Sequence, residues 1–440
     1  MIHVDSKTII PSVDETLGIL RMNNNLMPQY VDYDKLMQLI FFLDQRANTY
    51  GKDLFSVIGK PSGVQADGNL KNYLIEHRVD LSAFGTTETG NISLDEESIT
   101  MALESGKLSD EVINLISLYQ KYSKTAKSRS TCMSLLQNPM SEKISCDGHR
   151  MLELRPVWAP QNTGRVGMQK PAVQNIQREL QEVLTVPKGY VLLHTDSGQI
   201  EPRIVYSVYI RDPQIQALIR LYDDAYFGVL HYVTMPMSDI MSGRMDFEKH
   251  EITPEMKENR KNIKTYNNAV MYGSTSNAAG DPIKDALINR IGKHPVRLQL
   301  CDRLMGEINR GVNIVKTAFG TPIDITKSAK LTPGNMHSES VTQQKLKLMI
   351  NNPIQGTAAD LMRVSVSEAS RIIMTRTKDT YIYNYVHDAG CFCISEDEFD
   401  KVKDDLADIV SYDVEGWLPI KAEPEFGRDH GANGLFPDLY

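Results

Sequence analysis

The stretch Tyr383-Asn-Tyr-Val-His387-Asp388-Ala-Gly ends an apolar, strand-like run in an aspartate. A second stretch, Val191-Leu-Leu-His-Thr-Asp196-Ser-Gly-Gln199-Ile-Glu201-Pro-Arg203, does the same. Two carboxylates fixed on adjacent strands can hold two magnesium ions about 3.5–4 Å apart, a geometry that stabilises both the attacking and the leaving oxygen of phosphoryl transfer. The pair makes nucleotide transfer the leading hypothesis.

The segments around both aspartates predict a single β-sheet. A Lys-Gly turn after Pro187 leads into the apolar run that ends at Asp196, the signature of a buried strand. Residues 380–386 and 390–395 flank His387-Asp388 as the two arms of a hairpin. We therefore expect both aspartates on one sheet, with largely helical chain between them.

Length and composition indicate an ordinary enzyme of two or three subdomains. A chain of 440 residues is too long for one ordinary hydrophobic core. Of these residues, 41% are apolar, 24% charged and 7% aromatic. No apolar run approaches the roughly 18 residues of a membrane span, and the first residues lack the basic and apolar regions of a signal peptide. We expect a cytoplasmic protein without a membrane partner, in the host cytoplasm if a phage or plasmid encodes it.

The five cysteines are scattered and odd in number, without the paired spacing of a zinc site, so reduced thiols are expected. Cys391 and Cys393 alternate with Phe392 in a strand pattern. This alternation favours core cysteines over metal ligands.

Positive charge is concentrated in one segment. The formal net charge of −8 argues against a surface that is basic all round, but a local nucleic-acid cleft remains compatible with it. The run formed by Lys121, Lys124, Lys127 and Arg129 contains four cations and no acid, interleaved with hydroxyl residues that can donate to phosphate oxygens. The run predicts either a nucleic-acid contact or a solvated face. It ends a region, from about residue 14, whose apolar spacing predicts a helical arm.

A further helix is predicted to start at Thr253-Pro254-Glu255, with a cap, a proline and an early acid. At ~100° per residue, Arg260, Lys264, Asn268 and Tyr272 fall in one sector, and the apolar residues face the opposite side. Two cations one turn apart suit a triphosphate, and the tyrosine suits a base. Taken alone, a solvated basic face explains the same pattern.

Together these stretches resemble family A DNA polymerases, the DNA polymerase I class. The stretch from Asp196 to Arg203 resembles the first palm motif of that family, Arg260-x-x-x-Lys264 with Tyr272-Gly its fingers-helix motif, and Val-His387-Asp388 its second palm motif. Further matches are Thr-Gly-Arg165 followed by Gln174-Asn-Ile, and Asn351-Asn-Pro-Ile-Gln355-Gly-Thr-Ala-Ala-Asp360. Weaker likeness at residues 21–27 and 93–97 extends the resemblance over nearly the whole chain.

The resemblance implies an α+β fold with the right-hand polymerase architecture: a thumb, a palm with an antiparallel sheet, and helical fingers. The expected boundaries are residues 1–150 for the thumb and N-terminal helical region, 151–208 and 351–440 for the palm, and 209–350 for the fingers. The proofreading and 5′-nuclease domains of the family have no room here, so we expect a polymerase domain without its own exonuclease.

Carried over residue by residue, Asp196 and Asp388 would be metal ligands together with the main-chain carbonyl of Ser197. The expected cofactor is a pair of Mg²⁺ ions, with Mn²⁺ as a possible substitute. Lys264 would hold the incoming triphosphate with Arg260 and assist the pyrophosphate leaving group.

The resemblance also implies the substrate contacts. Glu201 would be the steric gate against a ribose 2′-hydroxyl, and Tyr272 would guard the insertion site. The other nucleotide-binding positions are Gln199, Tyr226 and Asn268. The DNA-binding residues would be Arg165, Asn351 and Gln355 in the minor groove, His387 near the primer end, and Lys121, Lys124, Lys127 and Arg129 along the backbone.

Several positions depart from the family pattern. Ala389 stands where a glutamate usually follows His-Asp, which removes a third carboxylate, and Asn268 replaces an aromatic that contacts the incoming sugar. Tyr226 stands where a histidine is expected, and Ser197 and Pro202 also differ. Sugar discrimination and speed are therefore open.

The implied reaction is attack of a primer 3′-hydroxyl on the α-phosphorus of a deoxynucleoside triphosphate, with primer–template DNA and deoxynucleotides as partners. A separately encoded exonuclease or processivity factor would complete replication. Two alternatives stay open: a catalytically retired, DNA-binding relative, motivated by Ala389 and Asn268, and a specialised lesion-bypass or gap-filling polymerase.

Overall fold

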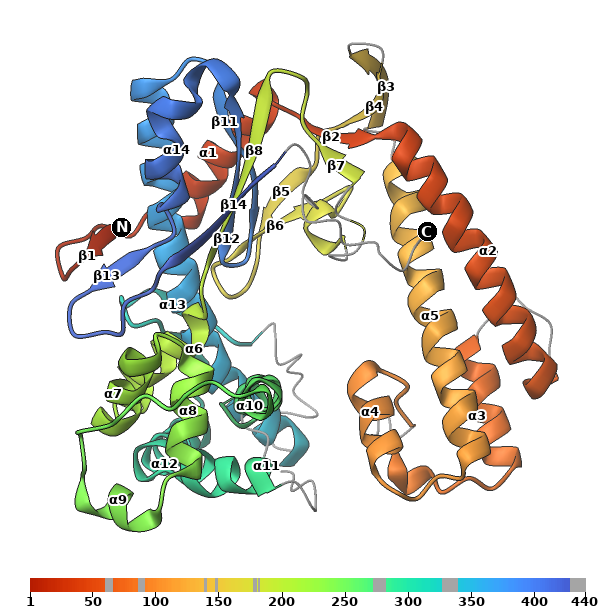
Figure 1. The fold of residues 1–440 in the computed structure, drawn as a ribbon, viewed down its shortest axis with the longest axis vertical. Helices are drawn as coiled ribbons and strands as arrows, with labels where there is room; N and C mark the ends of the chain where they lie inside the picture. Colours follow the sequence, from red (N-terminus) through yellow and green to blue (C-terminus); the bar gives the residue numbers. More distant parts are fainter. Residues whose placement is uncertain are drawn as a thin grey trace. The chain divides into compact units, whose positions relative to one another are not determined.

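The computed structural model describes residues 1–59, 66–85, 92–137, 141–146, 149–176, 180, 183–271, 282–326 and 339–427. The chain forms two compact units. Unit 1 contains the described residues of Met1–Gln29, Arg155–Gln174 and Val186–Ala432, and unit 2 those of Tyr30–Leu154 and Asn175–Thr185. Each unit has its own arrangement of helices and strands (Figure 1).

Unit 2 is built on two long helices, α2 (Tyr33–Ile58) and α5 (Asp110–Leu136), which pack along each other. Asp32 and Ser109 cap them by accepting main-chain hydrogen bonds. A buried apolar cluster that includes Leu54, Leu70 and Ile116 joins them to shorter helices. These are α3 (Ala66–Glu76), η1 (Leu81–Ala83) and α4 (Glu96–Glu104), and the sheet order at the other end is β3-β4-β2-β7 (Ser141–Cys146, His149–Leu154, Gln29–Asp32, Leu184–Thr185). The helices predicted for this region form, but the first of them, Val13–Leu26, belongs to unit 1 rather than to this arm.

The central sheet of unit 1 has the order β11-β12-β8-β14. Its strands are antiparallel: β8 (Tyr190–Ser197) lies between β12 (Ala389–Ser395) and β14 (Ala422–Gly427), and β11 (Thr380–Val386) pairs with β12. The strand ending near Asp196 and the hairpin around Asp388 therefore form as the sequence predicts.

A helical layer covers one face of this sheet. It consists of α1 (Val13–Leu26), α13 (Glu339–Arg376) and α14 (Phe399–Ala407) (Figure 1). Helix α13 contacts both α1 and α14, and all three contact the strands. Thr195 donates to the carbonyl of Ala407 at 2.7 Å, and Ser197 to that of Val410 at 2.8 Å. Since successive side chains of a strand point to opposite faces, Asp196 points away from this layer.

The remaining helices of unit 1 gather around the N-terminal half of α13. They are α6 (Ile200–Ile204), η4 (Val205–Tyr209), α7 (Pro213–Tyr222), α8 (Ala225–Thr234), α9 (Met237–Ser242), α10 (Pro254–Met271), α11 (Pro282–Leu287), η5 (Ile288–Gly292) and α12 (Pro295–Asn309). The smaller pieces are the pairs β1 (Ile2–Val4) with β13 (Tyr412–Val414), β5 (Val157–Pro160) with β6 (Val166–Gln169), β9 (Ile314–Lys316) with β10 (Pro322–Asp324), and the turns η2 (Val173–Asn175) and η6 (Glu396–Glu398).

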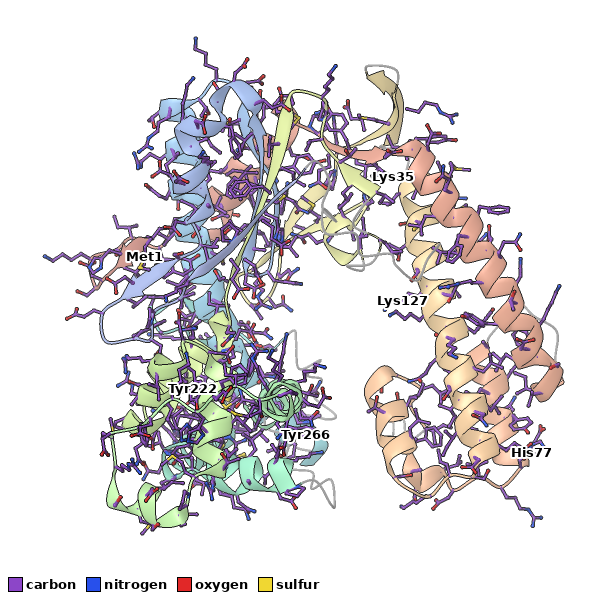
Figure 2. The ribbon with its side chains drawn as sticks, in the orientation of Figure 1. Met1, Lys35, His77, Lys127, Tyr222 and Tyr266 are labelled. Atoms are coloured by element: carbon purple, nitrogen blue, oxygen red, sulfur yellow. The ribbon has the colours of Figure 1, made fainter. Side chains whose placement is uncertain are left out.

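Helix α10 starts as predicted, because the Thr253 hydroxyl accepts from the amide of Met256 at 3.2 Å and Pro254 is its first residue. Ile263 and Val270 are buried, whereas Lys257, Lys261 and Lys264 are exposed. Tyr266, on the same helix, is labelled in Figure 2. The predicted amphipathic character is confirmed.

The α+β class is confirmed by this mixture of helices and largely antiparallel sheets. Cys132, Cys391 and Cys393 are buried free thiols and Cys301 is a partly exposed one, while the side chain of Cys146 lies outside the described residues. Across the described ranges, no helix combines the length and the apolar character needed to cross a bilayer. The boundaries between thumb, palm and fingers stay a prediction.

Candidate active site

Asp196 and Asp388 meet at one end of the central sheet. Asp388 lies in the two-residue turn between β11 and β12, and His387 takes the left-handed conformation with φ 50° that such tight hairpins use. The main-chain carbonyl of Asp388 accepts from the amide of Ser197 at 3.0 Å, and Ala389 is paired opposite Asp196. The hairpin places Asp388 at the end of the sheet, and the long-range pairing of β12 with β8 brings Asp196 beside it.

The neighbouring groups do not fully compensate the negative charge of either carboxylate in this pair. Burial raises the pKa of Asp196 to about 7, and the charges of Asp388 and Glu423 add to the rise, against the Ser197 amide and the charge of Lys264. Burial also raises the pKa of Asp388, with partial compensation from Arg165. Their negative charge is costly in the absence of a cation.

Glu423 is a member of this site that sequence reasoning missed. It lies on β14 directly opposite Asp196, on the other side from Ala389, so its side chain shares the face of Asp196. Gly198 gives it room: a Cβ there would meet a Glu423 carboxylate oxygen at 2.7 Å. The polar-apolar alternation of residues 421–426 hints at a strand, but no local signal names β8 as its partner.

The donor set fits a hard divalent cation. Mg²⁺ in enzymes is usually held by one or two carboxylates together with waters and substrate phosphates, rather than by a complete protein cage. Within the described ranges, no cluster of three or more His, Cys, Asp or Glu side chains forms such a cage. Asp196 and Asp388, with raised pKa values and oxygen donors only, match the first kind of site.

Arg260 is held by a second acidic residue, Asp224. Its Nε and Nη2 donate to Asp224 Oδ2 at 3.0 and 2.6 Å, and its guanidinium carbon lies 5.3 Å from the ring centroid of Tyr226. Gln199 donates to the same Asp224 oxygen at 2.8 Å and accepts from the amide of Ala225 at 2.6 Å. The structure therefore joins three predicted nucleotide-binding residues, Arg260, Gln199 and Tyr226, into one network.

Asp224 is the centre of that network, and sequence reasoning assigned it no role. It also caps α8 by accepting from the amide of Phe227 at 2.8 Å. Burial alone would raise the pKa of Asp224, but the hydrogen bonds and charge of Arg260, with the Phe227 and Gln199 bonds, lower it below its ordinary value. The position of Asp224 before a helix is a capping signal in the sequence, whereas its pairing with Arg260 depends on the tertiary fold.

Three further predicted nucleotide-binding residues belong to α10 or follow it directly: Lys264, Asn268 and Tyr272. Lys264 is exposed, and its charge reaches Asp196 and favours the ionised carboxylate. Asn268 belongs to α10, but its side chain is outside the described residues, as is the whole of Tyr272. The predicted helix end at Gly273 is outside them too.

Arg165 and Glu201 form an ion pair beside the aspartates. The side chains are 15% and 24% exposed, so both remain within reach of a ligand. Burial and the charge of Arg165 lower the pKa of His387, against the charges of Asp388 and Glu201. His387 is therefore mainly neutral at pH 7 and offers hydrogen bonds without a full positive charge.

Asn351 and Gln355 lie one turn apart on α13 and are both partly exposed. The side-chain oxygen of Asn351 and Nε of Arg165 are buried atoms without a hydrogen-bond partner. Unsatisfied buried polar atoms are uncommon in folded proteins, so both atoms are available for one further hydrogen bond. By contrast, Asp360 is satisfied within the fold by Arg363 and by Thr317 at 2.6 Å.

The four predicted backbone-binding cations lie on α5 of unit 2. Lys121, Lys124 and Lys127 are exposed, and Lys127 is labelled in Figure 2. Arg129 instead forms an ion pair with Asp44 of α2. The run thus contains exposed cations and one that joins two helices.

Comparison with known proteins identifies the family. The sequence pattern described as DNA polymerase family A matches residues 33–284 and 300–432. The thermostable DNA polymerase I of Thermus filiformis is 22% identical over 414 residues, which is 91% of this chain and 45% of that protein. The DNA polymerase I of Caldicellulosiruptor bescii is 24% identical over 406 residues, 89% of this chain and 43% of that protein. The chain thus spans less than half the length of these relatives.

A solved structure confirms the fold. The POL domain of Pol1 from M. smegmatis, in complex with DNA primer-template and dNTP, superimposes with a TM-score of 0.73 at 20% sequence identity. The likeness covers 96% of this chain and 70% of that one, and it supports the right-hand architecture predicted from the motifs. With the family pattern matched over most of its length, the chain belongs to DNA polymerase family A.

Proposed function

We propose that the chain is a template-directed DNA polymerase that adds deoxynucleotides to a primer 3′-hydroxyl. The observation that carries this proposal is the pair of incompletely neutralised carboxylates, Asp196 and Asp388, on adjacent strands of the sheet. The relatives named DNA polymerase I and the solved complex with primer-template and dNTP support it.

Asp196 and Asp388, with the main-chain carbonyl of Ser197, would hold two Mg²⁺ ions, or Mn²⁺ in their place. Such ions supply Lewis acidity that stabilises the attacking and leaving oxygens of an in-line displacement. Glu423 would add negative charge next to Asp196 from β14, on the other side of Asp196 from Ala389, which contributes no charge.

The helix α10 would bind the nucleotide. Lys264, whose charge already reaches Asp196, would neutralise the triphosphate and the pyrophosphate leaving group. Arg260 would exchange its partner Asp224 for a phosphate, since a guanidinium binds either group by the same paired donors. The remaining proposed nucleotide contacts are Gln199, Glu201, Tyr226, Asn268 and Tyr272.

Glu201 would select the sugar, because a carboxylate held by Arg165 occupies a fixed position. Arg165, Asn351 and Gln355 would follow the minor groove of the primer–template, with His387 near the primer end. The exposed lysines Lys121, Lys124 and Lys127 would contact phosphates, and Arg129 would support them through its ion pair with Asp44. We accordingly propose residues 1–150 as thumb, 151–208 and 351–440 as palm, and 209–350 as fingers.

The test is extension of a labelled DNA primer on a DNA template, with and without Mg²⁺ and with deoxy- and ribonucleotides offered separately. We expect extension with deoxynucleotides that requires Mg²⁺ and is lost in Asp388→Ala, while DNA binding is kept. Glu201→Ala should admit ribonucleotides. Tight DNA binding without extension would overturn the proposal in favour of a catalytically retired relative.

The biological role within this class stays a prediction. Lesion bypass, gap filling and main replication use the same chemistry, so the residues of the site do not distinguish these roles. Primer extension on damaged templates would distinguish them. A separately encoded exonuclease or processivity factor, the lack of an own exonuclease and a cytoplasmic location likewise stay predictions.

A further inference from the structure

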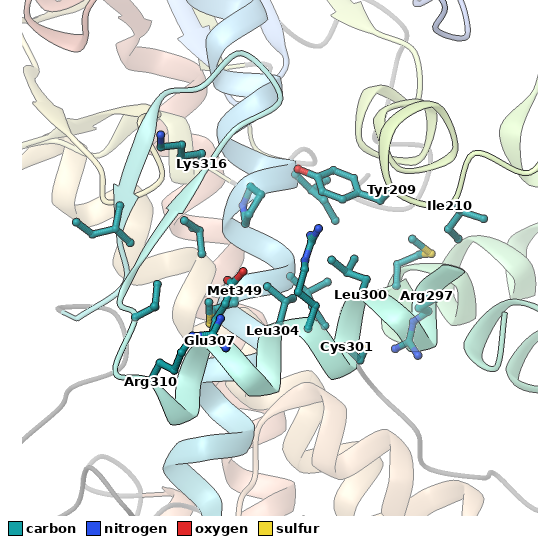
Figure 3. Close-up of a pocket in the computed structure, with 18 residues that line it drawn as sticks. Tyr209, Ile210, Arg297, Leu300, Cys301, Leu304, Glu307, Arg310, Lys316 and Met349 are labelled. Carbon is teal, nitrogen blue, oxygen red and sulfur yellow. The ribbon is translucent and has the colours of Figure 1, made fainter. Parts of the chain in front are cut away.

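A cavity of about 450 Å³ lies in unit 1 between α12, the β9–β10 hairpin and residues 349–354 of α13 (Figure 3). Its volume falls in the range of roughly 300–1,000 Å³ that is typical of small-molecule sites. The residues that form its apolar wall include Leu300, Leu304, Met349, Ile350 and Ile354. All of these except the partly exposed Leu300 are buried.

Cations surround this apolar wall. Arg303, Arg310 and Lys316 line the cavity and are exposed, and Glu307 is the one acid among its lining residues. In Figure 3, Lys316 on the hairpin, Arg310 near the end of α12 and Tyr209 frame the space. Among the described residues, no carboxylate forms an ion pair with Arg303, Arg310 or Lys316. The cavity therefore has an excess of positive charge.

Two polar features of the wall lack their regular partners. Arg297 is 7% exposed and donates to the carbonyls of Gly292 and Val270, yet its Nε is buried without a hydrogen-bond partner. Pro353, inside α13, has no N–H, so the carbonyl of Met349 loses its regular helical donor. Arg297, Met349 and Pro353 all line the cavity.

The cavity is separate from the proposed active site. Relative to Asn351, Gln355 lies at ~40° around α13, whereas the residues of α13 that line the cavity span ~160° to ~300°: Met349, Pro353, Ile350 and Ile354. The proposed DNA-facing amides therefore lie in a different sector of the helix from the cavity wall, and neither amide lines the cavity.

We propose that this cavity binds a small organic anion whose apolar body is aromatic. The buried aliphatic wall would cover the ring system, and Arg303, Arg310 and Lys316 would bind the charged group. Aryl carboxylates or sulfonates and nucleoside monophosphates share this chemistry. The site does not depend on the polymerase assignment, because none of these residues belongs to the proposed active site.

The first experiment titrates the protein with 8-anilinonaphthalene-1-sulfonate and follows its fluorescence. We expect saturation at one site, with affinity at least ~10-fold weaker in the double variant Arg303→Gln/Arg310→Gln, because two charge-assisted contacts are lost. The matched control is Arg371→Gln/Arg376→Gln, which removes the same charge from exposed positions at the far end of α13. The control should bind within ~2-fold of the unmodified protein.

The second experiment locates the ligand through Cys301, a partly exposed thiol that lines the cavity. Its alkylation by iodoacetamide, measured by mass spectrometry of the peptide that carries it, should slow when the anilinonaphthalene sulfonate is bound. Competition by naphthalene-1-sulfonate and by deoxyadenosine monophosphate then separates the two sources. Inorganic phosphate should displace the probe much less than either.

Saturable binding that weakens in Arg303→Gln/Arg310→Gln and protects Cys301 would establish the site, whichever aromatic anion competes better. Absence of saturable binding, equal binding in the double variant, or full alkylation of Cys301 at saturation would overturn it. Displacement by phosphate alone at equal concentration would also overturn it, since the apolar wall would then contribute nothing.

Discussion

Two acidic clusters in unit 1 differ in how far nearby cations compensate their negative charge. At the end of the sheet, Asp196 and Asp388 have raised pKa values, and Glu423 adds a further negative charge. At the junction of α7 and α8, Asp223 and Asp224 are surrounded by cations, which are Arg203, Lys421 and Arg260.

The difference lies in how far the protein itself compensates the negative charge of each cluster. Burial raises the pKa of a carboxyl group where nearby cations and hydrogen-bond donors do not offset it, whereas the ion pair and hydrogen bonds of Asp224 lower its pKa. Asp224 caps α8, holds α10 through Arg260 and positions Gln199. The sheet cluster therefore has the charge that the proposed metal ions need, and the helix cluster pairs with Arg260, which is proposed to exchange Asp224 for a phosphate.

The largest expected effect comes from neutralising the sheet cluster. Asp388→Asn should lower the rate of primer extension by at least ~10³-fold, since stabilisation of transition-state charge by bound metal ions amounts to several kcal/mol. Asp223→Asn, the equivalent change in the helix cluster, should cost less than ~10-fold. Single-turnover extension measures both, and equal losses would remove the distinction between the clusters.

The second effect concerns the apparent affinity for the deoxynucleotide. Arg260→Ala should raise KM at least ~10-fold, because a guanidinium–phosphate contact is lost. Asp224→Asn should lower KM by ~3-fold, because the competing partner of the guanidinium is weakened. A rise of KM in both variants would show that Asp224 positions Arg260 for the phosphate instead of competing with it.

The third effect concerns stability and its dependence on pH. The pKa of Asp196 is raised from 3.8 to about 7, so ionising it in the folded state costs stability, a cost that grows as pH rises over that interval. Without metal at pH 8, Asp196→Asn should therefore stabilise the protein by about 2 kcal/mol after allowance for solvent screening, and the gain should vanish below the ordinary pKa.

Asp224 predicts the opposite sign. Its lowered pKa contributes stability that is present above the ordinary value and is lost as pH falls through the folded value. Asp224→Asn should destabilise at pH 8 by about 1–3 kcal/mol. Thermal unfolding in EDTA at several pH values compares the two variants, and shifts of the same sign would contradict the contrast drawn here.

A smaller effect is expected at Glu423. Glu423→Gln removes a negative charge opposite Asp196, so the Mg²⁺ concentration for half-maximal extension should rise. The rise should be only about 3-fold, because exposed charges interact weakly. Glu425→Gln, two residues along the same strand, is the matched control. An unchanged Mg²⁺ requirement would leave Glu423 without a role in the site.

The smallest effect separates two cations of α5. Lys127→Ala should reduce the salt dependence of DNA binding by about one counterion, because an exposed lysine would neutralise one phosphate. Arg129→Ala should change unfolding more than DNA binding, since its guanidinium pairs with Asp44. The reverse pattern would exchange these roles.

The sequence predicts those parts of the site that depend on local rules. The hairpin at Asp388, the strand before Asp196 and the start of α10 follow from alternation and capping, which act over a few residues. The motif resemblance implies the fold as a whole. Lys264 and Asp196 are brought together by the tertiary fold, and the resemblance alone linked them beforehand.

Glu423 and Asp224 were missed because their partners are distant in the sequence. The register of β14 against β8 places Glu423, and the packing of α10 on α8 places Arg260 against Asp224. Neither contact has a local sequence signature. The cavity behind α13 is hidden for the same reason, since four separate segments form its wall.

The most direct test of the central claim is addition of one nucleotide, measured on four templates that differ only in the first unpaired base. Each deoxynucleoside triphosphate is offered alone with Mg²⁺, to the unmodified protein and to Asp388→Asn. We expect that only the complementary nucleotide is added efficiently, and that Asp388→Asn adds none while it still binds the primer–template. Addition that ignores the template, or equal addition by Asp388→Asn, would contradict this claim.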